Sequence, residues 1–166
     1  MYAYFAVDVY TYDLLHILLS PVNDEVAARV FLLELRAKGY NLSVIITDLR
    51  QDYGRVIKAV FPQAIHHECI FHALQNAQRQ IREVYGRDYQ DIPAAVALKE
   101  AIYRVFAAQS QKTVRQRYHQ VMALRQSYVA QMPGTAAIFD SLARHFPKLV
   151  NAIESDLIPR TNNAVE

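Results

Sequence analysis

The chain has 166 residues, of which 52% are hydrophobic, 11% aromatic and 20% charged, and its formal net charge is +2. This composition is typical of a folded domain with a buried core and excludes an intrinsically disordered chain. No run approaches the roughly 20 consecutive apolar residues that span a bilayer, and the N-terminal stretch lacks the basic region of a secretory signal. A single cysteine, Cys69, excludes an internal disulfide. We therefore expect a soluble, cytoplasmic protein.

The first part of the chain predicts a hairpin followed by a helix. Residues 2–9 and 13–20 are strand-length runs rich in aromatic and β-branched residues, and a short polar turn at 10–12 separates them. Asn23, Asp24 and Glu25 mark the start of a helix, and Gly39 marks its end. Apolar residues recur between these limits at helical spacing, namely Val26, Val30, Leu33 and Ala37.

A buried strand and a second helix are predicted next. Residues 42–47 are nearly all apolar and end in Asp48, which is typical of a central strand buried on both faces. Residues 53–60 predict a helix, and residues 64–67 predict a short strand. From about residue 69 to residue 153 the pattern is helical throughout. Its apolar stripes predict helix cores, and they comprise Leu98, Ile102, Val105 and Phe106; Val114, Tyr118, Val121, Met122 and Val129; and Ile138, Leu142 and Phe146.

Charge is divided unequally between these parts. Residues 1–48 hold three basic and six acidic side chains, whereas residues 79–125 hold nine basic and four acidic ones. An acidic α/β part beside a basic helical block fits a metal-dependent nuclease that also holds phosphates. A solvated helix surface would give the same count, so the charges alone leave both interpretations open.

Asp48 is the first candidate for a catalytic residue. It stands at the carboxyl end of the predicted buried strand, where open α/β sheets place their ligands. A carboxylate at this edge is suited to bind a divalent cation. The alternative is that Asp48 caps the following helix.

Residues 45–76 resemble the stretch around the second catalytic aspartate of DDE-type transposases from bacterial insertion sequences and their Mutator-type relatives. In those families an apolar strand ends in Asp and is followed by a Tyr, a helix, Phe-Pro-x-Ala, and a C-x-x-H pair with a later Asn. The corresponding residues here are Asp48, Tyr53, Phe61, Pro62, Ala64, Cys69, His72 and Asn76. The order and spacing of these residues make the resemblance specific.

The last residues of the chain resemble the third catalytic segment of the same families. There, Thr-Asn leads into a helix that carries the catalytic Glu, which implies that Asn162 and Asn163 precede a catalytic Glu166. A capping box from Asn163 to Glu166 fits the same letters, and the two interpretations are compatible. A helix that starts at the last residues could bury no face, so we expect the chain to be a fragment.

The resemblance implies an α/β fold with an RNase H-like core and a large all-helical insertion between the second and third acids. We expect residues 1–72 to be part of the core, residues 73–155 to be the insertion, and residues 156–166 to return to the core. The RNase H-like core has three strands before its first helix, with the first acid on strand one, but only two strands are predicted here. We therefore expect the first acid to lie upstream of Met1, with Asp8 as the alternative.

The implied activity is metal-dependent DNA cleavage and strand transfer in transposition. Three carboxylates would hold two Mg²⁺ or Mn²⁺ ions about 4 Å apart, with Asp48 and Glu166 among the ligands. The implied partner is DNA, both transposon ends and target, and the intact protein is expected to be a homodimer. Phosphate contacts are predicted from basic residues of the helical block, namely Arg79, Arg82, Arg104, Arg115 and Arg117.

Several alternatives remain at this point. Cys69 and His72 could begin a zinc site, but a second ligand pair is lacking, so zinc is not expected. They could also form a nucleophile and base, although no orienting third group is evident. The resemblance favours a structural or DNA-proximal C-x-x-H element, with Cys69 buried. The chain could also be an inactive transposase-derived module for DNA binding or assembly, or another RNase H-like nuclease.

Overall fold

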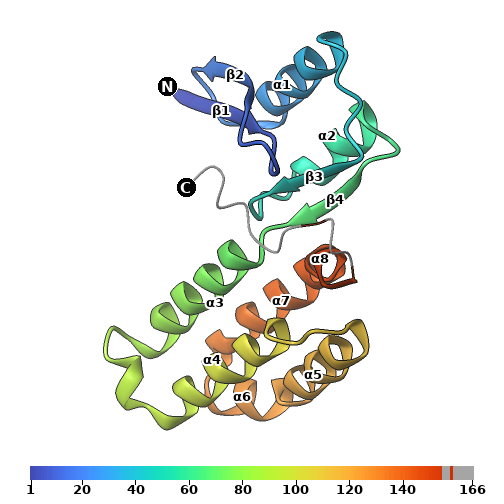
Figure 1. Ribbon diagram of the computed structural model, residues 1–166. Helices are drawn as coiled ribbons and strands as arrows, with labels where there is room; N and C mark the ends of the chain where they lie inside the picture. Colours follow the sequence, from blue (N-terminus) through green and yellow to red (C-terminus); the bar gives the residue numbers. More distant parts are fainter. Residues whose placement is uncertain (155–157, 159–166) are drawn as a thin grey trace. The chain divides into compact units, whose positions relative to one another are not determined.

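The computed structural model describes residues 1–154 and residue 158. These residues form two compact units that meet in sequence between His67 and Glu68. The first unit contains both strands and helices, whereas helices make up the second (Figure 1). The α/β class that the sequence predicts is therefore confirmed, in the form of small sheets with many helices.

The chain begins with the predicted hairpin. Strands β1 (Tyr2–Val7) and β2 (Leu14–Ser20) pair antiparallel, with Tyr4 opposite Leu18. The turn is closed by backbone bonds from the Asp8 N–H to the Asp13 carbonyl and from the Tyr12 N–H to the Asp8 carbonyl, both 2.9 Å. Tyr12, in this turn, adopts a φ of 62°, which is the left-handed conformation.

Helix α1 (Glu25–Ala37) begins and ends as predicted. The Asp24 carboxylate accepts a hydrogen bond of 2.9 Å from the Ala27 N–H, which satisfies a free donor of the first turn. Gly39 takes a φ of 91° just beyond the helix, a conformation that favours glycine. The side of α1 that packs into the core comprises Ala27, Ala28, Phe31, Leu32 and Leu35. The valines and Leu33 whose spacing indicated the helix lie exposed instead.

A strand–helix–strand segment completes the first unit: β3 (Val44–Thr47), α2 (Tyr53–Val60) and β4 (Ile65–Glu68). The β3 and β4 strands pair in a second sheet and run in the same direction (Figure 1). All four residues of β3 are half-buried, so the prediction of burial on both faces is wrong. A two-stranded sheet leaves an edge and part of one face open to solvent.

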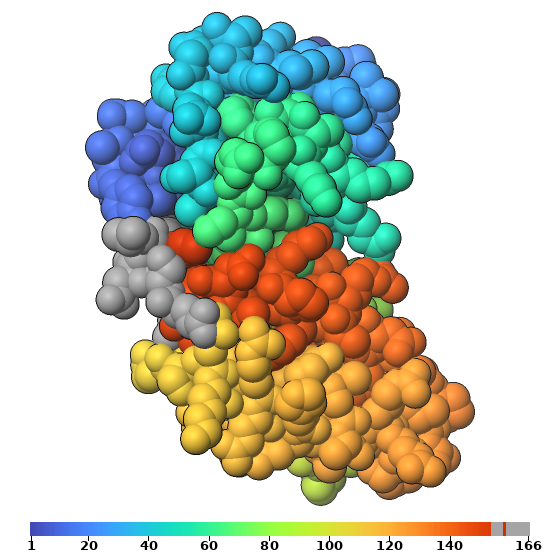
Figure 2. All heavy atoms as spheres, turned by 90° about the vertical axis from the view of Figure 1, so that its right-hand side faces the viewer, coloured from blue at the N-terminus to red at the C-terminus, as the bar shows by residue number. Residues whose placement is uncertain are grey.

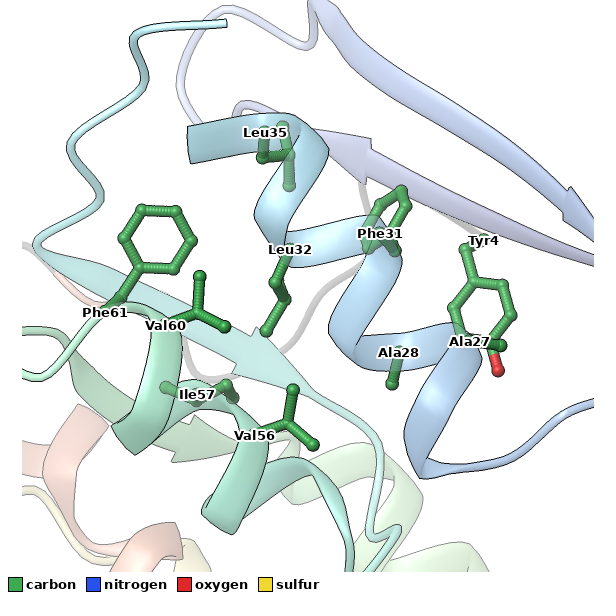
Figure 3. Packing of buried hydrophobic residues seen from close by; sticks show 10 residues of the cluster. All are labelled: Tyr4, Ala27, Ala28, Phe31, Leu32, Leu35, Val56, Ile57, Val60 and Phe61. Atoms are coloured by element: carbon green, nitrogen blue, oxygen red, sulfur yellow. The ribbon is translucent and has the colours of Figure 1, made fainter. Parts of the chain in front are cut away.

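The core of the first unit joins the hairpin to the two helices. Tyr4 of β1 lies beside Phe31 of α1, with ring centroids 5.6 Å apart. Leu32 of α1 faces Val56 and Val60 of α2 (Figure 3). Ile45 of β3 packs against this same cluster. The core therefore fixes the strand that precedes Asp48.

The second unit is a bundle in which α3 packs against α4 and α7, and α4 packs against α5. Its helices are α3 (Ile70–Tyr85), α4 (Pro93–Phe106), α5 (Gln111–Ala123), α6 (Arg125–Gln131), α7 (Ala136–Leu149) and α8 (Asn151–Glu154), with short 3-10 turns η1 (Tyr89–Asp91) and η2 (Pro133–Thr135). The stripes predicted on α4 and α7 are buried, which confirms that they form core. On α5, Val114 and Val121 are buried and Tyr118 stacks on Phe146 at 3.7 Å. Over the residues described, no helix is long and apolar enough to cross a membrane.

Candidate active site

Asp48 directly follows β3 and is half-buried. Its Oδ1 accepts a hydrogen bond of 3.1 Å from the Arg50 N–H, which closes a small turn after the strand. Helix α2 begins only at Tyr53, with Asp52 as its N-cap residue. The alternative that Asp48 caps this helix is therefore wrong, and its second carboxylate oxygen is not needed for the turn.

The end of β3 is fixed to β4 by side chains. The Thr47 hydroxyl donates to the Asp48 carbonyl at 2.8 Å, and the same oxygen lies 2.8 Å from Nε2 of His66. Because the hydroxyl has one proton and gives it to the carbonyl, His66 must donate from Nε2. This pair of bonds holds the backbone of Asp48 in place at the edge of the sheet.

Arg50 anchors the loop of residues 48–52 to two other segments. Its guanidinium bonds both oxygens of Asp52, with a distance of 3.1 Å from Nε to Oδ1, and also bonds the Asn23 amide oxygen. The Tyr4 hydroxyl donates to that same Asn23 oxygen at 2.8 Å. The guanidinium carbon also lies 5.1 Å from the centre of the Tyr53 ring. Arg50 therefore links the loop after β3 to the segment before α1 and, through Asn23, to strand β1.

The charges around Asp48 follow from these contacts. The hydrogen bond from Arg50 lowers the pKa of Asp52 below its ordinary value of 3.8, so the two form a stable ion pair. Burial, assisted by the negative charge of Asp48, raises the pKa of the Tyr53 phenol to about 12. At neutral pH Tyr53 is therefore protonated and can donate a hydrogen bond. The Arg50 guanidinium pairs with Asp52, so its contact with Asp48 is through the backbone N–H rather than through its charged group.

The Asp8 carboxylate forms hydrogen bonds within the hairpin turn. Its Oδ1 accepts hydrogen bonds from the N–H groups of Tyr10, at 2.8 Å, and Thr11, at 2.9 Å. These bonds, the one from Thr11 first, lower the pKa of Asp8 below 3.8. This arrangement suffices to explain an aspartate at this position. A catalytic role for Asp8 stays a prediction.

The C-x-x-H pair lies at the start of α3. Cys69 is fully buried and is the residue before the helix, which confirms the predicted burial, and His72 is half-buried in the first turn. Asn76, one turn further along, donates to the Ser141 hydroxyl at 3.1 Å and so ties α3 to α7. Among residues 1–154 and 158, no three His, Cys, Asp or Glu side chains gather as metal ligands.

A buried ionic cluster was not predicted from the sequence. Glu68, at the end of β4, has no exposed surface, and its two carboxylate oxygens lie 2.6 Å from Nδ1 of His145 and 2.8 Å from Nζ of Lys148. Burial alone would raise the pKa of Glu68, but the bonds from His145 and Lys148 outweigh it and lower the pKa below 4.5. His145, on α7, therefore has a buried acidic partner that lies 77 positions away in the sequence.

The predicted phosphate-binding arginines lie on three helices of the second unit, with Arg79 and Arg82 on α3, Arg104 on α4, and Arg115 and Arg117 on α5. Arg79 and Arg104 form exposed ion pairs one turn along their own helices, and Arg115 bonds the Gln111 side chain. Arg117 donates to the Arg104 carbonyl at 2.7 Å, which brings two of the predicted residues together. Exposed ion pairs and hydrogen bonds of this kind are weak, so these arginine side chains remain able to bind phosphate groups.

The remaining site residues predicted from the sequence, Asn162, Asn163 and Glu166, lie outside the described residues. Asn23, Arg50 and Tyr4 were not predicted as residues of the site. Arg50 carried one signal that could have indicated it, since a basic residue between Asp48 and Asp52 is well placed for a local ion pair.

The chain matches the model of a known protein family. The model of the family described as "Transposase, Mutator family" matches residues 11–165. The match takes in Asp48 and the C-x-x-H pair, Cys69 and His72. No curated protein matches the chain significantly.

Proposed function

Because the chain belongs to the Mutator family of transposases, we propose that it carries part of a DDE catalytic site and that Asp48 is the second of its three acids. The observation that carries this proposal is the position of Asp48, on a fixed turn directly after β3. Its carboxylate needs one oxygen for that turn, and Arg50 is paired with Asp52 rather than with it. The carboxylate is thus held in place by a backbone N–H, while the Arg50 guanidinium is engaged by Asp52.

The order of elements supports an RNase H-like core. Two antiparallel strands, a helix, a strand, a helix and a further strand follow one another in the first unit. This is the order that such a core has after its first strand. On this proposal, residues 1–72 belong to the core, residues 73–155 are a helical insertion, and residues 156–166 return to the core. The first acid then lies on a strand upstream of Met1.

The chemistry of the proposed ligands fits Mg²⁺ or Mn²⁺. Asp48 and Glu166 would supply carboxylate oxygens, which hard divalent cations prefer. When bound, the two ions would activate a water or a 3′-hydroxyl and stabilise the leaving oxygen of an in-line phosphoryl displacement. The bonds from Thr47 and Arg50 hold Asp48 in position for this, and the protonated phenol of Tyr53 supplies a nearby donor.

The proposal is tested by metal-dependent cleavage. The DNA on each side of the gene is placed on a labelled fragment and incubated with the intact protein that contains this chain. We expect nicks at defined positions with Mg²⁺ or Mn²⁺, and loss of at least about 99% of product with EDTA. Cleavage that persists in EDTA would contradict the two-metal mechanism.

The basic helices of the second unit are proposed to hold DNA phosphates. We predict that Arg115→Gln weakens DNA binding on all sequences and reduces the slope of log K against log salt by about 1. Fluorescence anisotropy between 50 and 200 mM salt, about the range over which such contacts are lost, measures this slope. Arg144→Gln, at an exposed position on α7, is the matched control and should leave the slope unchanged. Equal slopes for both variants would show that Arg115 does not contact the DNA phosphates.

The alternative is an inactive transposase-derived module that binds DNA or assembles with other chains. It predicts DNA binding with a normal salt slope but no metal-dependent nicks. The proposed partners are the same in both cases, transposon ends and target DNA, with the intact protein as a homodimer.

A further inference from the structure

Helix α1 has apolar side chains on two opposite sides. One side forms the core of the first unit and includes Phe31, Leu32 and Leu35 (Figure 3). On the other side Val26 is 67% exposed, Val30 40% and Leu33 46%. A surface helix normally carries charged and polar residues there. The spheres of α1 form part of the outer surface of the first unit (Figure 2).

The exposed residues follow the spacing of a coiled coil. Val26, Val30, Leu33 and Ala37, here called the α1 seam, are separated by four, three and four positions. This is the alternation of d and a positions in a heptad repeat, with Val30 at a and Leu33 at d. A β-branched residue at a with Leu at d favours pairs of parallel helices. The core residues of α1 then occupy b, c, e and f positions, with Phe31, Leu32 and Leu35 at b, c and f, away from the seam.

The charged residues beside the seam favour a parallel pair of identical helices. Arg29 and Arg36 fall at g positions and Glu34 falls at an e position. In a parallel pair, each g residue faces the e residue of the next heptad on the partner. Arg29 of one copy would therefore face Glu34 of the other, twice by symmetry. In an antiparallel pair g positions face g positions and e positions face e positions, so Glu34 would have no basic partner on the other copy.

We propose that the α1 seam binds the α1 seam of a second copy of this chain, with the two helices parallel. The core of each first unit lies on the far side of its own helix, so the seams can meet without displacing it. This inference specifies the surface of the proposed homodimer. It needs neither DNA nor metal, so its failure and the failure of the proposed cleavage are separate results.

The seam is short for an interface. Thirteen helical residues extend over about 20 Å, and two such helices bury less than the roughly 1,600 Å² of a standard interface. The dimer formed by this chain is therefore weak and exchanges rapidly. Its population rises with protein concentration.

Sedimentation velocity of the purified chain over a range of concentrations tests the proposal. We expect a reversible monomer–dimer equilibrium, and we expect Val30→Glu to raise the dimer dissociation constant about tenfold or more, since it places two carboxylates in the seam. Val22→Glu, at an exposed valine before the helix, is the control and should change the constant less than about twofold. Circular dichroism and thermal unfolding establish that both variants fold. A monomer at every concentration, or a dimer insensitive to Val30→Glu, would overturn the proposal.

A charge exchange tests the parallel orientation. Arg29→Glu and Glu34→Arg should each weaken self-association, because each places like charges opposite one another. An equimolar mixture of the two variants should form a heterodimer at least as readily as the unaltered chain. Arg29→Glu that strengthens association would indicate an antiparallel pair and overturn this part of the proposal. Glu34 also bonds His16 at 2.6 Å, so thermal unfolding must show that Glu34→Arg is folded before it is mixed.

Discussion

Replacement of Asp48 by Asn is expected to lower metal-dependent DNA cleavage about 1,000-fold or more while DNA binding and stability stay nearly unchanged. The Asn side chain keeps the oxygen that accepts the Arg50 N–H, so the turn after β3 persists. It lacks the negative charge that would hold a divalent cation. Cleavage of labelled DNA, fluorescence anisotropy and thermal unfolding measure the three quantities on the same preparation of the intact protein.

Asp8→Asn is the matched control for this experiment. Its Oδ1 also accepts backbone N–H groups in a turn, from Tyr10 and Thr11, so the substitution should leave the hairpin intact. On the proposal that the first acid lies elsewhere, this variant cleaves DNA normally. Loss of cleavage by both variants would make Asp8 a catalytic acid. Strong residual cleavage by Asp48→Asn would show that Asp48 is not a catalytic acid.

Local sequence signals predicted the first unit well because they act within a few residues. Asp24 caps α1 and Gly39 follows its end because a cap and a left-handed residue are needed at those positions. The hairpin was predicted from two strand-length runs and a polar turn. The periodicity of α1 gave its extent but not its buried side, because two apolar stripes run along the same helix.

Contacts between distant segments could not be read from the sequence. Arg50 joins Asn23 and, through it, Tyr4, and nothing local to any of the three indicates the others. The resemblance indicated Asp48 by its place in a motif, but the bonds that fix it depend on how β3, β4 and α1 pack. The three-acid site itself stays a prediction, since Glu166 lies outside the described residues.

The contact between Glu68 and His145 is the clearest example of one that the sequence does not indicate, since 77 positions separate the two residues. In the sequence, Glu68 stands within His-His-Glu-Cys, next to a possible metal ligand, and His145 stands alone. In the second unit the Glu68 carboxylate is fully buried against His145 and Lys148 of α7. A buried carboxylate of this kind needs its partners, because an unpaired charge inside a protein is strongly destabilising.

Glu68→Gln is therefore expected to lower the free energy of unfolding by about 3 kcal/mol at pH 7. The bonds from His145 and Lys148 lower the folded-state pKa of Glu68 below 4.5, so its contribution is present above about pH 4.5 and is lost as pH falls through the folded-state pKa. The difference between the unaltered chain and Glu68→Gln should shrink accordingly between pH 7 and pH 3, as followed by urea unfolding. Glu83→Gln removes an exposed pair with Arg79 and should change stability by less than about 0.5 kcal/mol. If the two variants were equally stable at pH 7, the buried cluster would not stabilise the second unit.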